Sequence, residues 1–164
     1  MSPLLLTVLI VATIAPRSQG APARYGAAEC GVSVASPHRL KHTRRALAGV
    51  TATSHFYTAE VRGTTFRLFC IRDQSIDGPS DELYATYRDG FLNDDPTQLV
   101  AERAVTLDGM VGREVHGAER DGTHSIVRVL IVPGSVLGAL VSGSREKVSS
   151  EEATRFLDSM QFER

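Results

Sequence analysis

The sequence predicts an α+β domain in which an antiparallel β-sheet of about six to seven strands packs with two main helices. Two observations near the C-terminus carry this prediction. Two apolar segments, 126–132 and 136–141, are separated only by Pro133-Gly134-Ser135, and an amphipathic segment follows them. A hairpin followed by a helix with one apolar face favours a layered fold, because each element must bury that face against another.

The closing helix is predicted from about residue 149 to residue 160. Ser149 and Glu152 have the spacing of a capping box, in which each side chain binds a free backbone N–H at the helix start. Apolar residues then recur with the spacing of one helical face, at Ala153, Phe156, Leu157 and Met160. We therefore expect this helix to lie on the hairpin.

Turn-forming residues divide the chain before this helix into strands. Proline followed by glycine favours a tight turn at 133–135, and Asp121-Gly122 and the segment 109–112 mark two more. The predicted strands cover 99–107, 113–118, 123–132 and 136–141, which form a four-stranded meander. A second hairpin is expected over 56–61 and 64–70, and an amphipathic helix over 80–92.

Residues 1–23 have the pattern of a signal peptide. An apolar segment extends from Leu4 to Ala15, and the small residues Gly20, Ala21 and Ala23 follow it. This segment is shorter than the roughly 20 apolar residues that cross a bilayer. We predict export with cleavage near Ala23, a short linker at 24–30, a single domain over 31–164, and no transmembrane segment in the mature chain.

Two cysteines, Cys30 and Cys70, suit an exported protein and can form one disulfide. A simple meander of strands near 31–36, 52–60 and 64–71 would place them at opposite edges, too far apart for a bond. Both the disulfide and two free thiols therefore remain open.

Three segments resemble parts of a known class of exported domain: Tyr87-Arg88-Asp89-Gly90-Phe91-Leu92, residues 100–115 with their GxxGRE pattern, and Arg155-Phe156-Leu157-Asp158-Ser159-Met160. Their order is similar to that in the Mog1/PsbP-like class of α/β domains, and the similarity covers most of 31–163. The resemblance implies a Mog1/PsbP-like sandwich of an antiparallel sheet and helices. It implies no particular activity, since the named relatives act as partner-binding proteins.

Composition and charge limit the classes of function that suit this chain. The chain has 164 residues, is 42% hydrophobic and 23% charged, and has a net charge of −1, which does not suit a nucleic-acid-binding protein. The charge is uneven only at 37–45, which we interpret as a loop. Its basic residues Arg39, Lys41, Arg44 and Arg45 could meet an anionic partner: a lipid headgroup, an acidic glycan or an acidic protein face.

The motif Gly109-Met110-Val111-Gly112 matches the GXXG form of KH domains, but it lies between two predicted strands and has no basic surroundings. We interpret Gly109 and Gly112 as turn residues. Arg113 is expected to order that turn through a carboxylate such as Asp108.

The histidines offer candidate ligands but no complete site. His38 and His42 lie in the basic segment without a third ligand, His55 is isolated, and His116 and His124 flank the Asp121-Gly122 turn. The sequence contains none of the common catalytic signatures. We therefore predict no catalytic residue, no cofactor and no native metal site.

Two classes of function stay open. The favoured one is an exported, non-catalytic domain that binds an unidentified protein or small ligand in the cell envelope. The alternative is a small hydrolytic or metal-dependent enzyme that uses His116 and His124 with Glu114 or Glu119. A lipid carrier is a third hypothesis, since the small residues Gly138 and Ala139 could leave an apolar cavity.

Overall fold

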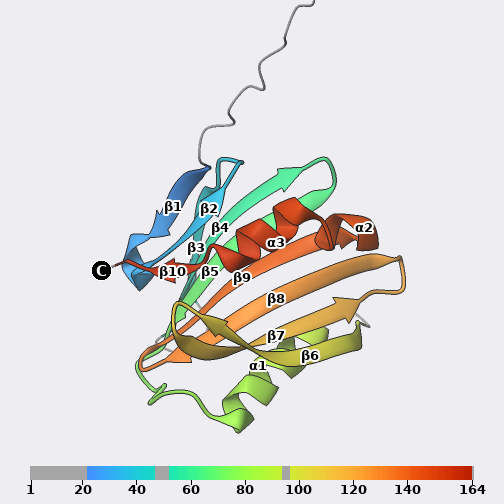
Figure 1. Cartoon of the computed structure of the whole chain (residues 1–164). Coiled ribbons are helices and arrows are strands. Elements are labelled where there is room, and N and C mark those ends of the chain that lie inside the picture. Colours follow the sequence, from blue (N-terminus) through green and yellow to red (C-terminus); the bar gives the residue numbers. More distant parts are fainter. Residues whose placement is uncertain (1–21, 47–51, 94–96, 164) are drawn as a thin grey trace, which may run out of the picture.

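A computed structural model describes residues 22–46, 52–93 and 97–163. A seven-stranded antiparallel sheet, in the order β3-β4-β5-β9-β8-β7-β6, forms the centre (Figure 1). Its strands are β3 (Lys41–Ala46), β4 (Thr53–Val61), β5 (Thr64–Arg72), β6 (Gln98–Leu107), β7 (Met110–Ala118), β8 (Thr123–Val132) and β9 (Ser135–Ser144). The predicted α+β class is confirmed.

Strands β6 to β9 form the predicted meander, and each pairs with its neighbour in antiparallel register. Pro133 and Gly134 form the turn between β8 and β9, where Gly134 has φ +75°. Strands β8 and β9 lie in the middle of the sheet, which explains their almost continuous apolar character. The predicted β4–β5 hairpin is also present, and β5 pairs with β9 to complete the sheet.

Helices cover both faces of this sheet. Helix α1 (Asp81–Asn93) lies on one face, over a cluster that includes Val115, Val127 and Ile131. Helices α2 (Arg145–Val148) and α3 (Glu151–Asp158) lie on the opposite face, where Phe156 is 1% exposed and meets Phe66 edge to face. The predicted apolar stripe of the last helix is confirmed, since all four of its residues are buried: Ala153, Phe156, Leu157 and Met160.

The start of that helix differs from the prediction. Ser150 is the N-cap, and its hydroxyl accepts a hydrogen bond from the Ala153 backbone N–H at 3.2 Å. Ser149 instead ends α2, a short helix that the sequence pattern did not reveal. Glu152 makes no capping box, and its Oε1 lies within hydrogen-bond distance of His38 Nε2, at 2.7 Å.

The segment predicted as a linker is also different. Residues 24–30 belong to β1 (Ala23–Ala27) and the 3-10 helix η1 (Ala28–Cys30). Strand β1 pairs with β2 (Val32–Ser36), and β2 pairs with the short β10 (Gln161–Phe162), so the two ends of the domain meet in a separate three-stranded sheet. Within residues 24–30 only Ala27 is buried, so backbone pairing with β2 and the disulfide at Cys30 hold this segment in place.

The predicted signal peptide lies almost entirely outside the described residues, which begin at Pro22. Within those residues, no helix combines the length and apolar character needed to cross a membrane.

The third hypothesis requires an apolar cavity beside Gly138. Neighbouring atoms fill the space there. A Cβ atom on Gly138 would lie 2.2 Å from the Phe69 ring and 2.7 Å from the Arg128 carbonyl oxygen. Glycine is therefore needed at this position for close packing on the α1 side of the sheet.

Candidate functional site

The basic segment forms an edge strand, not the predicted loop. Lys41–Ala46 pair with residues 53–58 of β4, and all six residues are exposed. Strand pairing depends on backbone groups, and charged side chains are common on edge strands because they discourage pairing with other chains. The sequence prediction was wrong here because it relied on an apolar pattern that an edge strand does not need.

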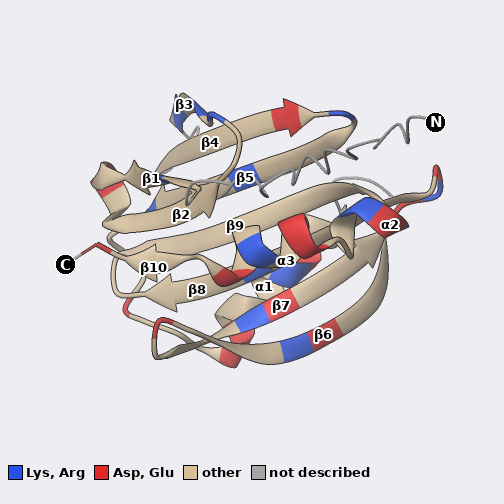
Figure 2. Cartoon of the chain, turned by 45° about the horizontal axis from the view of Figure 1, so that its top comes forward, with Lys and Arg blue, Asp and Glu red and all other residues tan. Residues whose placement is uncertain are grey.

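The four predicted binding residues lie in or just before β3, and they do not share one face of the strand. Arg39 precedes β3, and Lys41 and Arg45 share one face of the strand with Thr43. Arg44 lies on the other face, opposite His55 of β4. Figure 2 shows this basic strand at the rim of the sheet.

Among the residues that the structure describes, none of these four basic side chains takes part in an ion pair. The guanidinium of Arg45 lies 6.0 Å from the centre of the Phe56 ring, and that of Arg67 lies 5.5 Å from it. A groove runs along the same edge and is lined by residues of β3, β4 and the segment before β3, including Pro37, Arg39, Lys41, Thr43 and Glu60.

The glycines of the GXXG segment lie in a turn and in a strand of the main sheet, where each has a structural role. Asp108 and Gly109 form the turn between β6 and β7 with φ values of +46° and +84°, as tight hairpins require. Gly112 lies within β7 instead of the turn, and a Cβ atom there would come within 2.4 Å of the Val129 carbonyl oxygen.

Arg113 does not order this turn. Its guanidinium binds Asp81 at 2.9 Å and lies over the Tyr84 ring at 5.5 Å, so it connects β7 to α1. Asp108 accepts a hydrogen bond from the Phe162 backbone N–H at 2.9 Å and so holds β10.

The histidine pair of the enzyme hypothesis does meet, since His116 Nε2 lies 3.0 Å from His124 Nδ1. Its proposed carboxylate is engaged elsewhere. Glu114 binds Arg103 at 2.6 Å and Arg128 at 2.7 Å, and Arg128 also binds Asp158 of α3. Within the described part of the chain, neither Glu114 nor Glu119 joins the two histidines in a group of three metal-ligating atoms.

Cys30 and Cys70 form a disulfide, with Cα atoms 6.2 Å apart. The expected separation at opposite sheet edges does not apply, because Cys30 belongs to η1 in the small N-terminal sheet region and not to the main sheet. This region packs over the face of β5, where Cys70 is fully buried. The bond therefore fastens the N-terminal hairpin to the centre of the fold.

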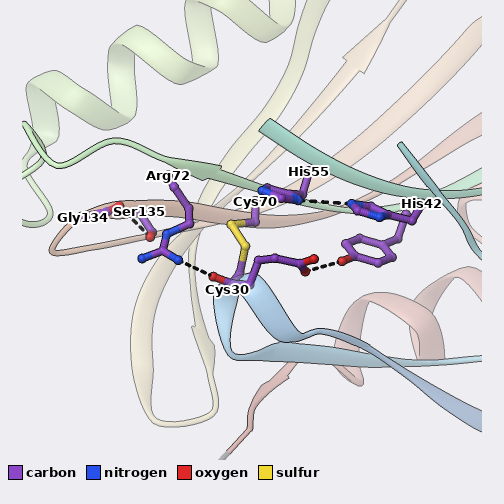
Figure 3. Close-up of a disulfide and its surroundings, with 9 residues drawn as sticks. Cys30, His42, His55, Cys70, Arg72, Gly134 and Ser135 are labelled. Carbon is purple, nitrogen blue, oxygen red and sulfur yellow. Dashed lines mark hydrogen bonds between the residues drawn. A yellow bond between two sulfur atoms is a disulfide. The ribbon is translucent and has the colours of Figure 1, made fainter. Parts of the chain in front are cut away.

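A polar cluster beside this disulfide was missed by the sequence analysis. His42 Nε2 of β3 lies 3.2 Å from His55 Nδ1 of β4, and the Tyr57 hydroxyl donates a hydrogen bond to Glu29 Oε2 at 2.6 Å. Figure 3 shows the two histidines meeting next to the disulfide. Ligating atoms of Glu29, His42 and His55 all lie within 4.8 Å of one another.

The surroundings set the charges of this cluster. The hydrogen bond from Tyr57 lowers the pKa of the Glu29 carboxyl, so Glu29 is ionised at neutral pH. Burial, which disfavours the charged imidazole, lowers the pKa of His55. Burial first, and then the hydrogen bond to Glu29, raise the pKa of the Tyr57 hydroxyl, which therefore stays a donor.

The two histidines could have been paired only if β3 had been recognised as a strand. Its register then places His42 opposite Tyr57 and His55 opposite Arg44, so the histidines are diagonal neighbours on one face. Glu29 reaches them because it precedes Cys30, whose disulfide partner Cys70 lies opposite His55 on β5.

Comparisons with protein-family models and with curated proteins gave no match. A comparison with solved structures matched the solution structure of cyanobacterial PsbP (CyanoP) from Synechocystis sp. PCC 6803. The TM-score is 0.63, the match covers 93% of this chain and 98% of that chain, and the two sequences are 11% identical. At this identity the similarity shows the fold, and the predicted Mog1/PsbP-like sandwich is confirmed.

Proposed function

We propose that this chain is an exported, non-catalytic binding domain of the cell envelope, and that it binds an acidic protein partner along strand β3. The observation that carries the proposal is the exposure of this strand and of its basic side chains. It lies at the edge of the main sheet, all its residues are exposed, and its basic side chains have no ion-pair partner among the described residues.

An edge strand offers both backbone and side-chain contacts to a partner. The backbone groups of β3 that face away from β4 can pair with an extended segment, which would add a strand to the sheet. Lys41, Arg44 and Arg45 would then select acidic side chains on that segment. The same charges discourage pairing between two copies of this edge, since like charges would face each other.

Export is supported by two independent features. The first is the signal-peptide pattern of residues 1–23. The second is the Cys30–Cys70 disulfide, because such bonds persist in oxidising compartments and are rare in the cytosol.

The enzyme alternative has less support. Its histidines, His116 and His124, hydrogen bond to each other, and the carboxylate of Glu114 is held by two arginines. A general base needs a free carboxylate or imidazole within reach of a substrate proton.

The test is a capture experiment from envelope extract with the mature domain as bait and a photo-cross-linker at the exposed Thr43 of β3. The double variant Lys41→Glu/Arg45→Glu reverses two charges on β3 and leaves Arg44, the basic residue opposite His55, in place. Arg120→Glu reverses the charge of an exposed residue in the β7–β8 turn and is the matched control.

We expect a cross-linked acidic protein that is captured by the wild type and by Arg120→Glu. It should be lost from the double variant and reduced at high salt, since exposed charges are screened. Equal capture by all three baits would contradict the proposal. Loss of binding to anionic vesicles in Arg44→Ala/Arg45→Ala, with no protein cross-link, would also contradict it and would indicate a membrane surface instead.

A further inference from the structure

Three separate segments bring metal-ligating side chains together beside the disulfide. Glu29 comes from η1, His42 from β3 and His55 from β4, and their ligating atoms lie within 4.8 Å of one another. Residues so distant in the sequence meet only in the folded chain. Two imidazoles and one carboxylate are the ligand set of many zinc sites, in which a fourth position stays open.

The distance between the two imidazole nitrogens suits a metal ion. His42 Nε2 and His55 Nδ1 are 3.2 Å apart. Two nitrogen ligands of a tetrahedral zinc ion, each about 2.05 Å from the metal, lie about 3.3 Å apart. In the structure this contact is a hydrogen bond between rings that are within 3° of parallel.

A metal ion would take the place of that hydrogen bond. The donor ring would move its proton to its other nitrogen, so that both imidazoles bind as neutral ligands. His42 is exposed and can turn its lone pair toward the ion, whereas His55 is 6% exposed and is held by its surroundings.

The carboxylate is already oriented by a neighbouring group. The Tyr57 hydroxyl binds Glu29 Oε2 at 2.6 Å, which leaves Oε1 for a metal ion. Hydrogen bonds of this kind fix ligating carboxylates in metalloproteins and strengthen binding. The His42 ring stacks on the Tyr57 ring, with centroids 4.5 Å apart, so Tyr57 contacts two of the three ligands.

The charges around the cluster restrict the kind of ion. Arg44 lies opposite His55, and Arg72 donates a hydrogen bond to the Glu29 carbonyl oxygen at 3.0 Å. These two positive charges oppose a cation that is held by charge alone, such as Mg²⁺ or Ca²⁺, which also prefer oxygen ligands. Imidazole nitrogens favour zinc and copper, whose bonds to nitrogen are stronger.

We propose that Glu29, His42 and His55 form a binding site for a divalent transition metal, with zinc as its first candidate. The site uses side chains other than Lys41 and Arg45, which lie on the other face of β3. Its fourth coordination position faces solvent beside the exposed Glu29 and His42, where water or a partner's side chain can bind.

The disulfide controls this site. Glu29 is adjacent to Cys30, and Cys70 lies opposite His55 across β4 and β5. The bond therefore fixes the carboxylate near the imidazoles. Without it, η1 would be free to move away from the histidines, and the affinity for metal would fall.

The test is calorimetric titration of chelator-treated purified protein with zinc chloride. We compare the wild type with Glu29→Gln, His42→Ala and Cys30→Ala/Cys70→Ala. The control is His116→Ala/His124→Ala, which removes the other close histidine pair, 3.0 Å apart. Circular dichroism checks that each variant is folded, and Glu29 and His42 are chosen because both are exposed.

The expected result is one equivalent of zinc bound by the wild type and by the control. Glu29→Gln, His42→Ala and the disulfide variant should each bind at least about tenfold more weakly. Unchanged affinity in both Glu29→Gln and His42→Ala would overturn the proposal. So would the absence of zinc binding by the wild type, or its loss in the control.

Discussion

Arg128 Nε lies 2.7 Å from Glu114 Oε2 across strands β8 and β7, and both side chains are largely buried, at 9% and 12% exposure. Arg128 also binds Asp158 of α3, so one guanidinium joins two strands to the helix above them. This contact explains why an arginine lies in the apolar strand β8 and why Glu114 is not free for chemistry.

Replacing Arg128 by alanine should therefore be costly. It would leave the buried Glu114 carboxylate without its inner partner, and we expect the free energy of unfolding to fall by about 3 kcal/mol. Arg103, the outer partner of the same carboxylate, has a side chain that is 66% exposed. Arg103→Ala should therefore cost less than about 1 kcal/mol. Urea unfolding of both variants measures the difference, and equal losses would refute this role of Arg128.

Helix α3 is held by apolar contacts with the sheet. Phe156 is 1% exposed, and its ring centre lies 5.4 Å from that of Phe66. Phe156→Ala should lower the free energy of unfolding by about 3 to 5 kcal/mol, because it opens a cavity in the core. Arg155→Ala, on the exposed side of the helix, is the control and should have little effect. A small effect of Phe156→Ala would show that α3 does not pack on the sheet in solution.

The disulfide should contribute to stability as well as to the arrangement of the cluster. It joins residues 40 positions apart, and closing a loop of that length in the unfolded chain is worth about 4 kcal/mol. Cys30→Ala/Cys70→Ala should lose about that amount in urea unfolding under oxidising conditions. Under reducing conditions the wild type should approach the variant. If reduction left the wild type unchanged, the bond would not constrain the chain.

Stability should also depend on pH in a defined window. Burial first, and then His124 and Arg145, lower the pKa of His116 below its ordinary 6.5. The unfolded chain takes up this proton as pH falls through about 6.5, whereas the folded chain resists protonation. The free energy of unfolding should therefore decrease as pH falls from 7 to 5, and His55 acts in the same direction.

Unfolding in urea at pH 7, 6 and 5 tests this dependence. His116→Gln removes one of the two groups and should make the decrease smaller than in the wild type. Equal decreases in the two proteins would contradict the assignment to His116.

Local patterns in the sequence were sufficient to predict the β8–β9 hairpin and the buried face of helix α3. The β8–β9 hairpin was predictable because Pro133 and Gly134 define the turn and the strands on each side are apolar. The face of α3 was predictable because its buried residues follow helical spacing. Its first residue was misplaced by one, since two adjacent serines can each serve as a cap.

The parts that were missed depend on contacts between distant segments. Strand β3 carries charges instead of an apolar pattern and is defined only by its pairing with β4. Residues 24–30 looked like a linker, because most of them are exposed and β1 is defined only by its backbone pairing with β2. The cluster of Glu29, His42 and His55 required both of these placements, so sequence reasoning treated His55 as isolated.

Two properties of the chain are central: its export, which we propose, and the disulfide that joins its N-terminal hairpin to the main sheet. The most direct measurement is mass spectrometry of the chain after expression in a bacterial host and separation of periplasm from cytoplasm. We predict a periplasmic protein cleaved near Ala23, where β1 begins, that yields a Cys30–Cys70 linked peptide. A full-length chain in the cytoplasmic fraction with two free thiols would contradict the account.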